Sequence, residues 1–359
     1  MKEFALTLLL FVLALPMTEA QFLNFPQASK KASVSEQIGL TTVQIDYHRP
    51  RVNNREGQIW GQLVPYGSPW RAGANDNTVI SFEHDVKING ADLKAGAYGF
   101  HIIPNESEDW ILIFSNTTTA WGSFAYKQEE DALRVSASPS ECTFTEWLKF
   151  EITSTGNNSA RIELLWENLK VGFDVELDLH EIVLTSIRNE LGHLHGFTWQ
   201  GWNQAAQYCL NNDVNLEEGL QWVEMSISGS PFFSEANFSN LQTKGQLLAK
   251  LGREEEWAKV MKKAVEKANM SQLHFYARGL IQQGKNEEAM KMFELNRKRN
   301  PDDNFTTYVG LARGHMALGN NKEAIKYFRM AAPNAPQGQQ QIYENLAKQL
   351  EEKGWTEYL

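Results

Sequence analysis

Apolar and polar residues alternate along the first half of the chain. Between about residues 32 and 178 the alternation recurs in short runs, and Val43, Ile45 and Tyr47 with their polar neighbours form the clearest one. A period of two residues is typical of strands that are buried on one face. We therefore predict an antiparallel β-sandwich of about eight to ten strands over residues 21–178.

Turn residues and continuous apolar runs divide this half into individual strands. Asn89-Gly90 tolerates positive φ and predicts a tight turn. The unbroken apolar run Trp110–Phe114 predicts an interior strand rather than an edge strand. Two alternating runs, Ile162–Trp166 and Val171–Leu177, are predicted to form a hairpin with Glu167-Asn168 as its turn.

At Asp178 the apolar period changes to that of a helix. Asp178 and Glu181 have the spacing of a capping box, and apolar residues then recur at helical intervals as far as Leu191. Gly192 is expected to end this helix. Residues 179–199 are therefore predicted to be a connecting helix and a linker.

The second half of the chain contains an internal repeat. Residues 319–328 are similar to residues 284–293 at a spacing of 35, and weaker copies begin at Gly252 and Asn215. The copy at Gly252 departs from the pattern because Trp257 stands where a small residue is usual. The signature positions of the last copy are Tyr308, Ala312, Gly319, Ala324, Phe328, Ala331 and Pro336.

This pattern resembles tetratricopeptide repeats. Small residues in such repeats let two helices approach closely, and an aromatic residue fills the gap to the next pair. The resemblance predicts a helical solenoid of about four repeats over residues 200–338, with a capping helix over residues 339–359. It implies a protein or peptide partner.

The first twenty residues have the layout of a secretory signal peptide. Lys2 precedes an apolar run from Phe4 to Leu15, and the small residue Ala20 precedes Gln21. The apolar run is too short to span a bilayer core of roughly 30 Å. We expect cleavage after Ala20 and an exported chain, periplasmic or extracellular, without a transmembrane segment. A retained N-terminal anchor is the alternative.

Composition and charge narrow the classes of function. Of the 359 residues, 42% are apolar and 22% charged, which is typical of a folded protein. The net charge of −10 argues against nucleic acid as a partner, because phosphate binding needs a dense basic surface. Two cysteines, Cys142 and Cys209, are too few for a structural zinc site and fall in different predicted domains, so no disulfide is expected between them.

Motifs in the first domain resemble those of a family of exported bacterial proteins. The segments that carry the resemblance are Asp46–Pro50, Gly61–Gly67, Trp70–Asn75 and Ala95–Tyr98. Together they identify about residues 28–178 as a member of domain-of-unknown-function family twenty-nine-eleven. Some members of that family carry helical repeats after this domain. The resemblance implies an all-β domain and export, and it implies no established reaction.

The same motifs contain a candidate ligand site. Four arginines lie between Tyr47 and Asn75 with a single acidic residue, Glu56. Guanidinium groups present a planar fork of donors to carboxylate or phosphate. The candidate residues are Arg49, Tyr66, Trp70, Arg71 and Asn75. Alternatively, the arginines pair with carboxylates of the sandwich and hold down a glycine-rich loop.

A second candidate site follows from the tetratricopeptide register. In that register the inner helices present polar and basic side chains to one concave surface. The residues concerned are Tyr208, Gln242, Gln246, Lys250, His274, Arg278, Gln282 and Arg313. We predict a groove for an acidic peptide or one with a C-terminal carboxylate. The alternative is that these side chains are simply solvated.

Catalytic and metal-binding signals are weak. The sequence contains no nucleophile elbow, H-E-x-x-H pair or phosphate-binding Gly-Lys-Ser/Thr motif, and His193 and His195 have no nearby third ligand, so no cofactor or metal is expected. Two classes of function remain. The first is a non-enzymatic interaction protein. The second is a hydrolase or carbohydrate-binding protein with its site in the Arg49–Asn75 loop, which histidines or acids converging beside Arg71 would favour.

Overall fold

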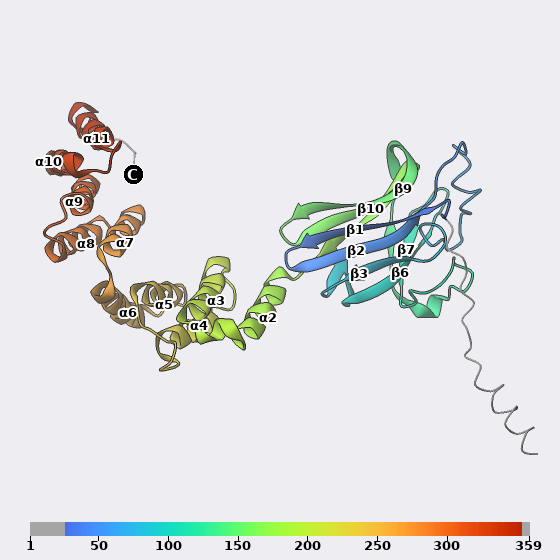
Figure 1. Cartoon of the computed structure of the whole chain (residues 1–359), viewed down its shortest axis with the longest axis horizontal. Helices are drawn as coiled ribbons and strands as arrows, with labels where there is room; N and C mark the ends of the chain where they lie inside the picture. The colour runs from blue at the N-terminus through green and yellow to red at the C-terminus, as the bar shows by residue number, and fades with distance from the viewer. Residues whose placement is uncertain (1–25, 354–359) are drawn as a thin grey trace, which may run out of the picture. The chain divides into compact units, whose positions relative to one another are not determined.

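The computed structural model describes residues 26–353, which form a β-sandwich followed by paired helices (Figure 1). The chain divides into two compact units between Leu184 and Thr185. The predicted fold class is confirmed. The predicted signal peptide lies outside the described residues. Within residues 26–353, no helix combines the length and apolar character needed to cross a membrane.

Ten antiparallel strands in the described residues form two sheets around one core. The larger sheet has the order β1 (Lys30–Ile38), β2 (Thr41–Arg49), β3 (Thr78–Phe82), β6 (Gly96–Ile103), β7 (Trp110–Ser115) and β8 (Asp131–Ala137). The smaller sheet has the order β5 (Ala91–Leu93), β4 (Val86–Ile88), β10 (Ser159–Glu176) and β9 (Ser140–Gly156).

Aromatic side chains fill the space between the sheets. The ring centroid of Phe173 in β10 lies 5.7 Å from that of Phe100 in β6 and 5.2 Å from that of Phe114 in β7. All three residues are buried, as alternation along these strands requires. Strand β7 lies between β6 and β8, so the prediction of an interior strand is confirmed.

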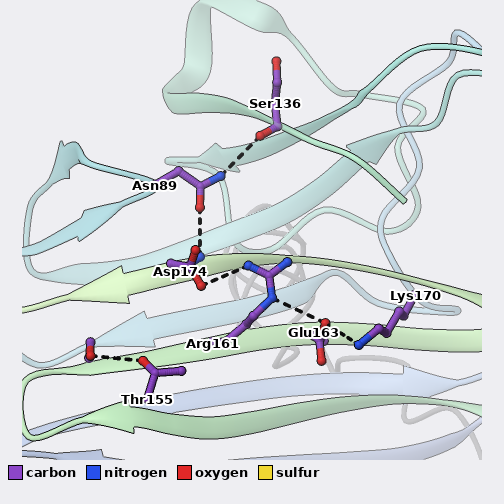
Figure 2. A network of polar contacts seen from close by, with 8 residues as sticks. Asn89, Ser136, Thr155, Arg161, Glu163, Lys170 and Asp174 are labelled. Atoms are coloured by element: carbon purple, nitrogen blue, oxygen red, sulfur yellow. Dashed lines mark hydrogen bonds and ion pairs between the residues drawn. The ribbon is translucent and has the colours of Figure 1, made fainter. Parts of the chain in front are cut away.

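Asn89 connects the two sheets. Together with Gly90 it forms the turn between β4 and β5, with φ of 48° and 83°, as predicted. The Asn89 side chain accepts a hydrogen bond from the Asp174 amide at 2.8 Å and donates one to the Ser136 carbonyl at 3.2 Å (Figure 2). On the same face the Arg161 guanidinium lies 2.9 Å from the Asp174 carboxylate. The charged groups here satisfy one another, which indicates a structural network.

The predicted hairpin around Glu167-Asn168 is wrong. Strand β10 continues through this point from Ser159 to Glu176. Glu167 adopts a φ of 58° and breaks the register with β9, so it forms a β-bulge rather than a turn. The buried Glu167 carboxylate accepts a hydrogen bond from the Gly57 amide, which holds the bulge against the preceding loop. The true hairpin joins β9 and β10 at residues 157–158.

Asp178 begins the connecting helix. Its carboxylate accepts a hydrogen bond from the Glu181 amide at 3.2 Å, and α2 (Leu179–Leu191) follows directly. A short 3-10 helix, Leu194–Phe197, comes next. Thr198 then caps the first helix of the repeats.

Four helix pairs and a final helix make up the rest of the described chain. They are α3 (Trp199–Asn212) with α4 (Leu216–Ser228), α5 (Phe238–Lys250) with α6 (Glu254–Lys267), α7 (Met270–Gln282) with α8 (Asn286–Arg299), α9 (Thr306–Ala317) with α10 (Asn321–Ala331), and α11 (Gln340–Lys353). Gly252, Gly284 and Gly319 follow α5, α7 and α9 with φ between 72° and 76°. Because this conformation suits glycine, these residues end the first helix of the last three pairs and account for part of the sequence repeat.

Glycines within α9 allow close packing against the preceding pair. A Cβ atom on Gly310 would lie 2.6 Å from the Phe293 ring, and one on Gly314 would lie 2.6 Å from the Met290 sulfur. Phe293, on α8, is fully buried by this contact. The aromatic residue therefore fills the gap between successive pairs, as the resemblance to tetratricopeptide repeats implies.

Candidate functional site

A cleft of about 240 Å³ lies between the second and third helix pairs. Its lining includes Gln242 and Gln246 from α5, Trp257 from α6, and Phe275 and Gly279 from α7. Phe275 is 65% exposed, and a Cβ atom on Gly279 would meet nothing within 4 Å, so the α7 side of the cleft is open to solvent. Polar amides and exposed aromatic faces suit an extended peptide.

Two guanidinium groups extend this surface from α7 to α9, which pack against each other. The Arg278 guanidinium lies 5.9 Å from the centroid of the Phe275 ring. Arg313 is half-buried, and its Nε atom is enclosed without a hydrogen bond. Within residues 26–353 neither arginine forms a salt bridge. We call Phe275, Arg278 and Arg313 the arginine face.

His274 lies beneath the arginine face. It is buried, and its Nδ1 atom has no hydrogen-bond partner in the described chain. Burial, followed by the charges of Arg313 and Arg278, lowers the pKa of His274 to about 4, so this imidazole is neutral at pH 7. Burial and the neighbouring Arg278 charge also lower the pKa of Arg313. The two guanidinium charges thus repel each other, and a bound anion would stabilise both.

The other predicted groove residues are distributed more widely. Gln246 lines the cleft, whereas Lys250 forms a salt bridge of 2.9 Å with Asp213. Tyr208 is half-buried on α3, and burial raises its pKa. Gln282 is exposed at the end of α7. The structure therefore brings His274, Arg278 and Arg313 together and leaves the remaining residues at other points along the first helices.

The predicted ligand residues of the Arg49–Asn75 loop mostly bind the protein itself. Three of them donate hydrogen bonds within the sandwich: Arg49 Nε to the Leu148 carbonyl at 2.8 Å, Trp70 Nε1 to the Gly73 carbonyl at 3.1 Å, and Asn75 Nδ2 to Gln27 Oε1 at 2.8 Å. Tyr66 is exposed and covers Gly61, where a Cβ atom would lie 2.6 Å from its ring. These contacts shape the loop. Arg71 differs from them, because its guanidinium has no hydrogen bond or salt bridge within residues 26–353.

Two histidines that sequence reasoning missed lie beside Arg71. His48 follows the core residue Tyr47 in β2, and His101 follows the core residue Phe100 in β6. Alternation places both histidines on the outer face of the larger sheet, and the positive charge of Arg71 reaches both. The same alternation could have signalled them, since a histidine next to a core residue on each of two strands shares a face.

No group of three or more histidine, cysteine or acidic side chains in the described part of the chain is placed to hold a metal ion. His195 lies 3.8 Å from the Glu190 carboxylate, and both are exposed. Cys142 and Cys209 are free thiols in separate units.

Comparisons with known families find one match in each of the two units. Residues 29–175 match the family described as "Protein of unknown function (DUF2911)", and residues 239–266 match the family described as "Tetratricopeptide repeat". The second match covers α5 and α6, the pair in which Trp257 departs from the expected pattern. No curated protein matches the chain.

A solved structure of a MamA mutant has 14% sequence identity to this chain. The match covers 44% of this chain and 84% of the MamA chain, with a TM-score of 0.28. At that TM-score the likeness carries no argument. The family matches rest on sequence, and they agree with the order of the two units in the structure. Residues 29–175 therefore match this family of unknown function, and a match to tetratricopeptide repeats follows in the same chain.

Proposed function

We propose that this chain is an exported, non-enzymatic interaction protein. Its helical repeats bind a peptide segment of a partner protein, and its sandwich is a ligand- or partner-binding domain. The tetratricopeptide match supports the scaffold role of the helices. Export, to the periplasm or the exterior, is proposed from the first twenty residues alone.

The observation that carries the peptide proposal is the unpaired state of Arg278 and Arg313. Most arginines elsewhere in the repeats have partners: Arg253 forms a salt bridge of 2.7 Å with Glu217, and Arg297 donates to the Tyr308 hydroxyl at 3.1 Å. Arg278 and Arg313 come from neighbouring first helices, and Arg278 lies over the ring of Phe275, which lines the cleft. An enclosed guanidinium nitrogen without an acceptor is unfavourable by about 1–3 kcal/mol, so an incoming carboxylate gains from this arrangement.

The arginine face selects for a particular kind of peptide. Two guanidinium groups favour an acidic side chain or a C-terminal carboxylate. Phe275 adds an exposed apolar ring beside them, and Gln242 and Gln246 offer amide groups to a peptide backbone across the cleft. The expected partner segment therefore combines one or two carboxylates with a neighbouring apolar side chain.

Binding of defined peptides to the full chain tests this proposal. The probes are a fluorescent peptide with an Asp-Glu pair next to leucine and a free C-terminus, and its amidated Asn-Gln counterpart. We expect the acidic peptide to bind more tightly. Replacing both arginines, Arg278→Ala with Arg313→Ala, should weaken it at least tenfold, since each charge-assisted contact contributes about 1.5–3 kcal/mol when desolvated.

A matched control separates local recognition from net charge. Lys263→Ala with Lys298→Ala removes the same charge from the second helices α6 and α8, where both side chains are exposed. This control should change the peptide affinity by less than about twofold, because exposed and distant charges are screened. Equal losses in the two double variants, or no loss in either, would contradict the proposal.

The second candidate function, a hydrolase or carbohydrate-binding protein, has one observation in its favour. His48 and His101 converge beside Arg71, and His101 Nδ1 lies 2.9 Å from Ser123 Oγ. Burial, followed by the Arg71 charge, lowers the pKa of His101 to about 4. An imidazole with that pKa is a weak general base at neutral pH. The geometry therefore favours binding over hydrolysis at this place.

A further inference from the structure

We infer that the outer face of the larger sheet carries a binding site for a small molecule with a carboxylate or phosphate group on a ring, recognised by Arg71, His48 and His101. This inference rests on the proposal that the sandwich binds a ligand, and it is independent of the helical repeats.

The two histidines are buried although they lie outside the core. His48 is 5% exposed and His101 is 2% exposed. The segment that follows β7 covers them: the Asn77 amide donates to the Ala120 carbonyl at 3.1 Å, and Ser123 contacts His101. The ring of Tyr126 lies 5.4 Å from that of His101. Residues 117–126 thus form a cover over this part of the sheet, which we call the loop cover.

Several polar atoms under the loop cover lack partners. Within the described residues, His48 Nδ1, Arg71 Nε and Asn77 Oδ1 are enclosed and form no hydrogen bond. Buried polar groups in folded proteins nearly always have a partner, and an unsatisfied one is unfavourable. Three such atoms on adjacent elements therefore form a cluster whose donors and acceptor are available to a ligand.

Arg71 sets the charge of this cluster. A Cβ atom on Gly122 would lie 3.6 Å from Arg71 Nη1, so the guanidinium reaches the loop cover. Burial lowers the pKa of Arg71, and the Asp76 charge opposes that effect without forming a salt bridge in the described chain. Burial also lowers the pKa of both histidines, which keeps them neutral beside the guanidinium. A neutral imidazole can donate to an anion without adding to the local positive charge.

An aromatic pair lies at the edge of the cluster and indicates that the ligand carries a ring beside its anionic group. Trp121 is 65% exposed and Phe124 is 85% exposed, and their ring centroids are 6.0 Å apart at an angle of 22°. Both flank Gly122, where a Cβ atom would lie 2.9 Å from the Phe124 ring. Exposed ring faces next to a guanidinium fork suit a flat or sugar ring that carries one oxyanion group. Carboxylate and phosphate share this chemistry, so separate probes must distinguish them.

A comparison of two arginines from separate motifs tests the inference. Arg49→Met removes a guanidinium that is bonded to the Leu148 carbonyl, whereas Arg71→Met removes one without a protein partner. Calorimetric titration of the full chain uses five probes: glucuronate, glucose 6-phosphate, benzoate, inorganic phosphate and neutral glucose. We expect at least one of the ring-bearing anions to bind, more tightly than inorganic phosphate, and glucose not to bind.

The variants should separate ligand binding from stability. Arg71→Met should weaken the bound probe at least tenfold while the melting temperature of the free chain stays unchanged or rises, because an unpaired buried charge is lost. Arg49→Met should lower the melting temperature and retain the affinity. Trp121→Ala should weaken a ring-bearing probe more than inorganic phosphate. The Arg278→Ala and Arg313→Ala double variant should bind the probe as the wild type does.

Three results would overturn the inference in distinguishable ways. If Arg71→Met lowers the melting temperature as much as Arg49→Met and retains the probe, Arg71 is structural and the ligand site of the sandwich lies elsewhere. If the arginine-face double variant loses the probe, the anion binds to the repeats. If the wild type binds none of the charged probes, the ligand-binding role proposed for the sandwich fails together with this site.

Discussion

The surroundings of Trp70 indicate whether the Trp70–Asn75 segment is a structural motif or a ligand-binding one. Sequence reasoning placed its indole in a ligand site, but the structure packs it among other tryptophans. Its ring is stacked on Trp166 with centroids 5.8 Å apart, and it meets Trp60 edge to face at 5.7 Å. Its Nε1 atom donates to the Gly73 carbonyl at 3.1 Å. We predict that Trp70→Ala destabilises the sandwich.

The size of the effect follows from these contacts. Removing a large aromatic side chain from a core raises the free energy of the folded state by about 3–5 kcal/mol. Trp70 is only partly buried, so we expect the lower end, about 3 kcal/mol. Trp70→Phe keeps a ring beside Trp166 and loses the hydrogen bond to Gly73, and it should lower stability by about 1 kcal/mol.

Hydrogen exchange followed by mass spectrometry measures the sandwich separately from the helices within the full chain. Peptides from β6 and β7 should exchange about a hundredfold faster in Trp70→Ala, since 1.4 kcal/mol corresponds to a factor of ten. Tyr66→Ala, an exposed residue in the same loop, should change exchange by less than about threefold. Unchanged exchange in Trp70→Ala, with loss of a bound ligand, would refute the structural interpretation.

Three further predictions address other parts of the chain. Intact-mass analysis from the native host should find a chain that starts at Gln21 or a neighbour, and a chain retaining Met1 in the membrane fraction would contradict export. Asn89→Ala should lower the free energy of unfolding, measured in urea, by about 1–3 kcal/mol beyond the effect of an ordinary surface substitution. Asn89→Gly, which tolerates the φ of 48°, should lose only the two side-chain hydrogen bonds. His101 and His274 have a pKa near 4 when folded against 6.5 for the free group, so the unfolded chain binds protons first. Each unit should therefore lose about 2–3 kcal/mol between pH 6.5 and 4, and His274→Asn should remove most of that slope from the helices.

Alternation and helical spacing were sufficient to predict the overall fold. Val43, Ile45 and Tyr47 face the core because a strand exposes every second residue, and the helix after Asp178 begins where that period ends. The β-bulge was missed because Glu167 is neither glycine nor asparagine, so its positive φ has no sequence signal. Its carboxylate bond to Gly57 comes from a contact between residues far apart in the chain.

The candidate sites were harder to predict, because arginines with similar sequence surroundings have different environments. Arg49 and Arg71 belong to two motifs of the same family resemblance, yet only Arg49 donates to a backbone carbonyl. Arg278 and Arg313 lie on packed helices because a repeat of 35 residues places equivalent positions on adjacent first helices. Lys250 lies at the end of α5, one turn beyond the equivalent position, and Asp213 from the preceding pair neutralises it. Pairing of this kind depends on the loops, which the repeat pattern does not specify.

Site-specific photocrosslinking at the arginine face tests the peptide-binding proposal most directly. A photoreactive phenylalanine at Phe275 lies beside Arg278, and one at Lys263 on α6 serves as the control. We predict that crosslinking in the native host at position 275 yields partner segments rich in Asp and Glu or ending in a free carboxylate. Their yield should fall at least tenfold with Arg278→Ala and Arg313→Ala. Equal crosslinking from position 263, or an undiminished yield from the double variant, would contradict a peptide-binding role for these repeats.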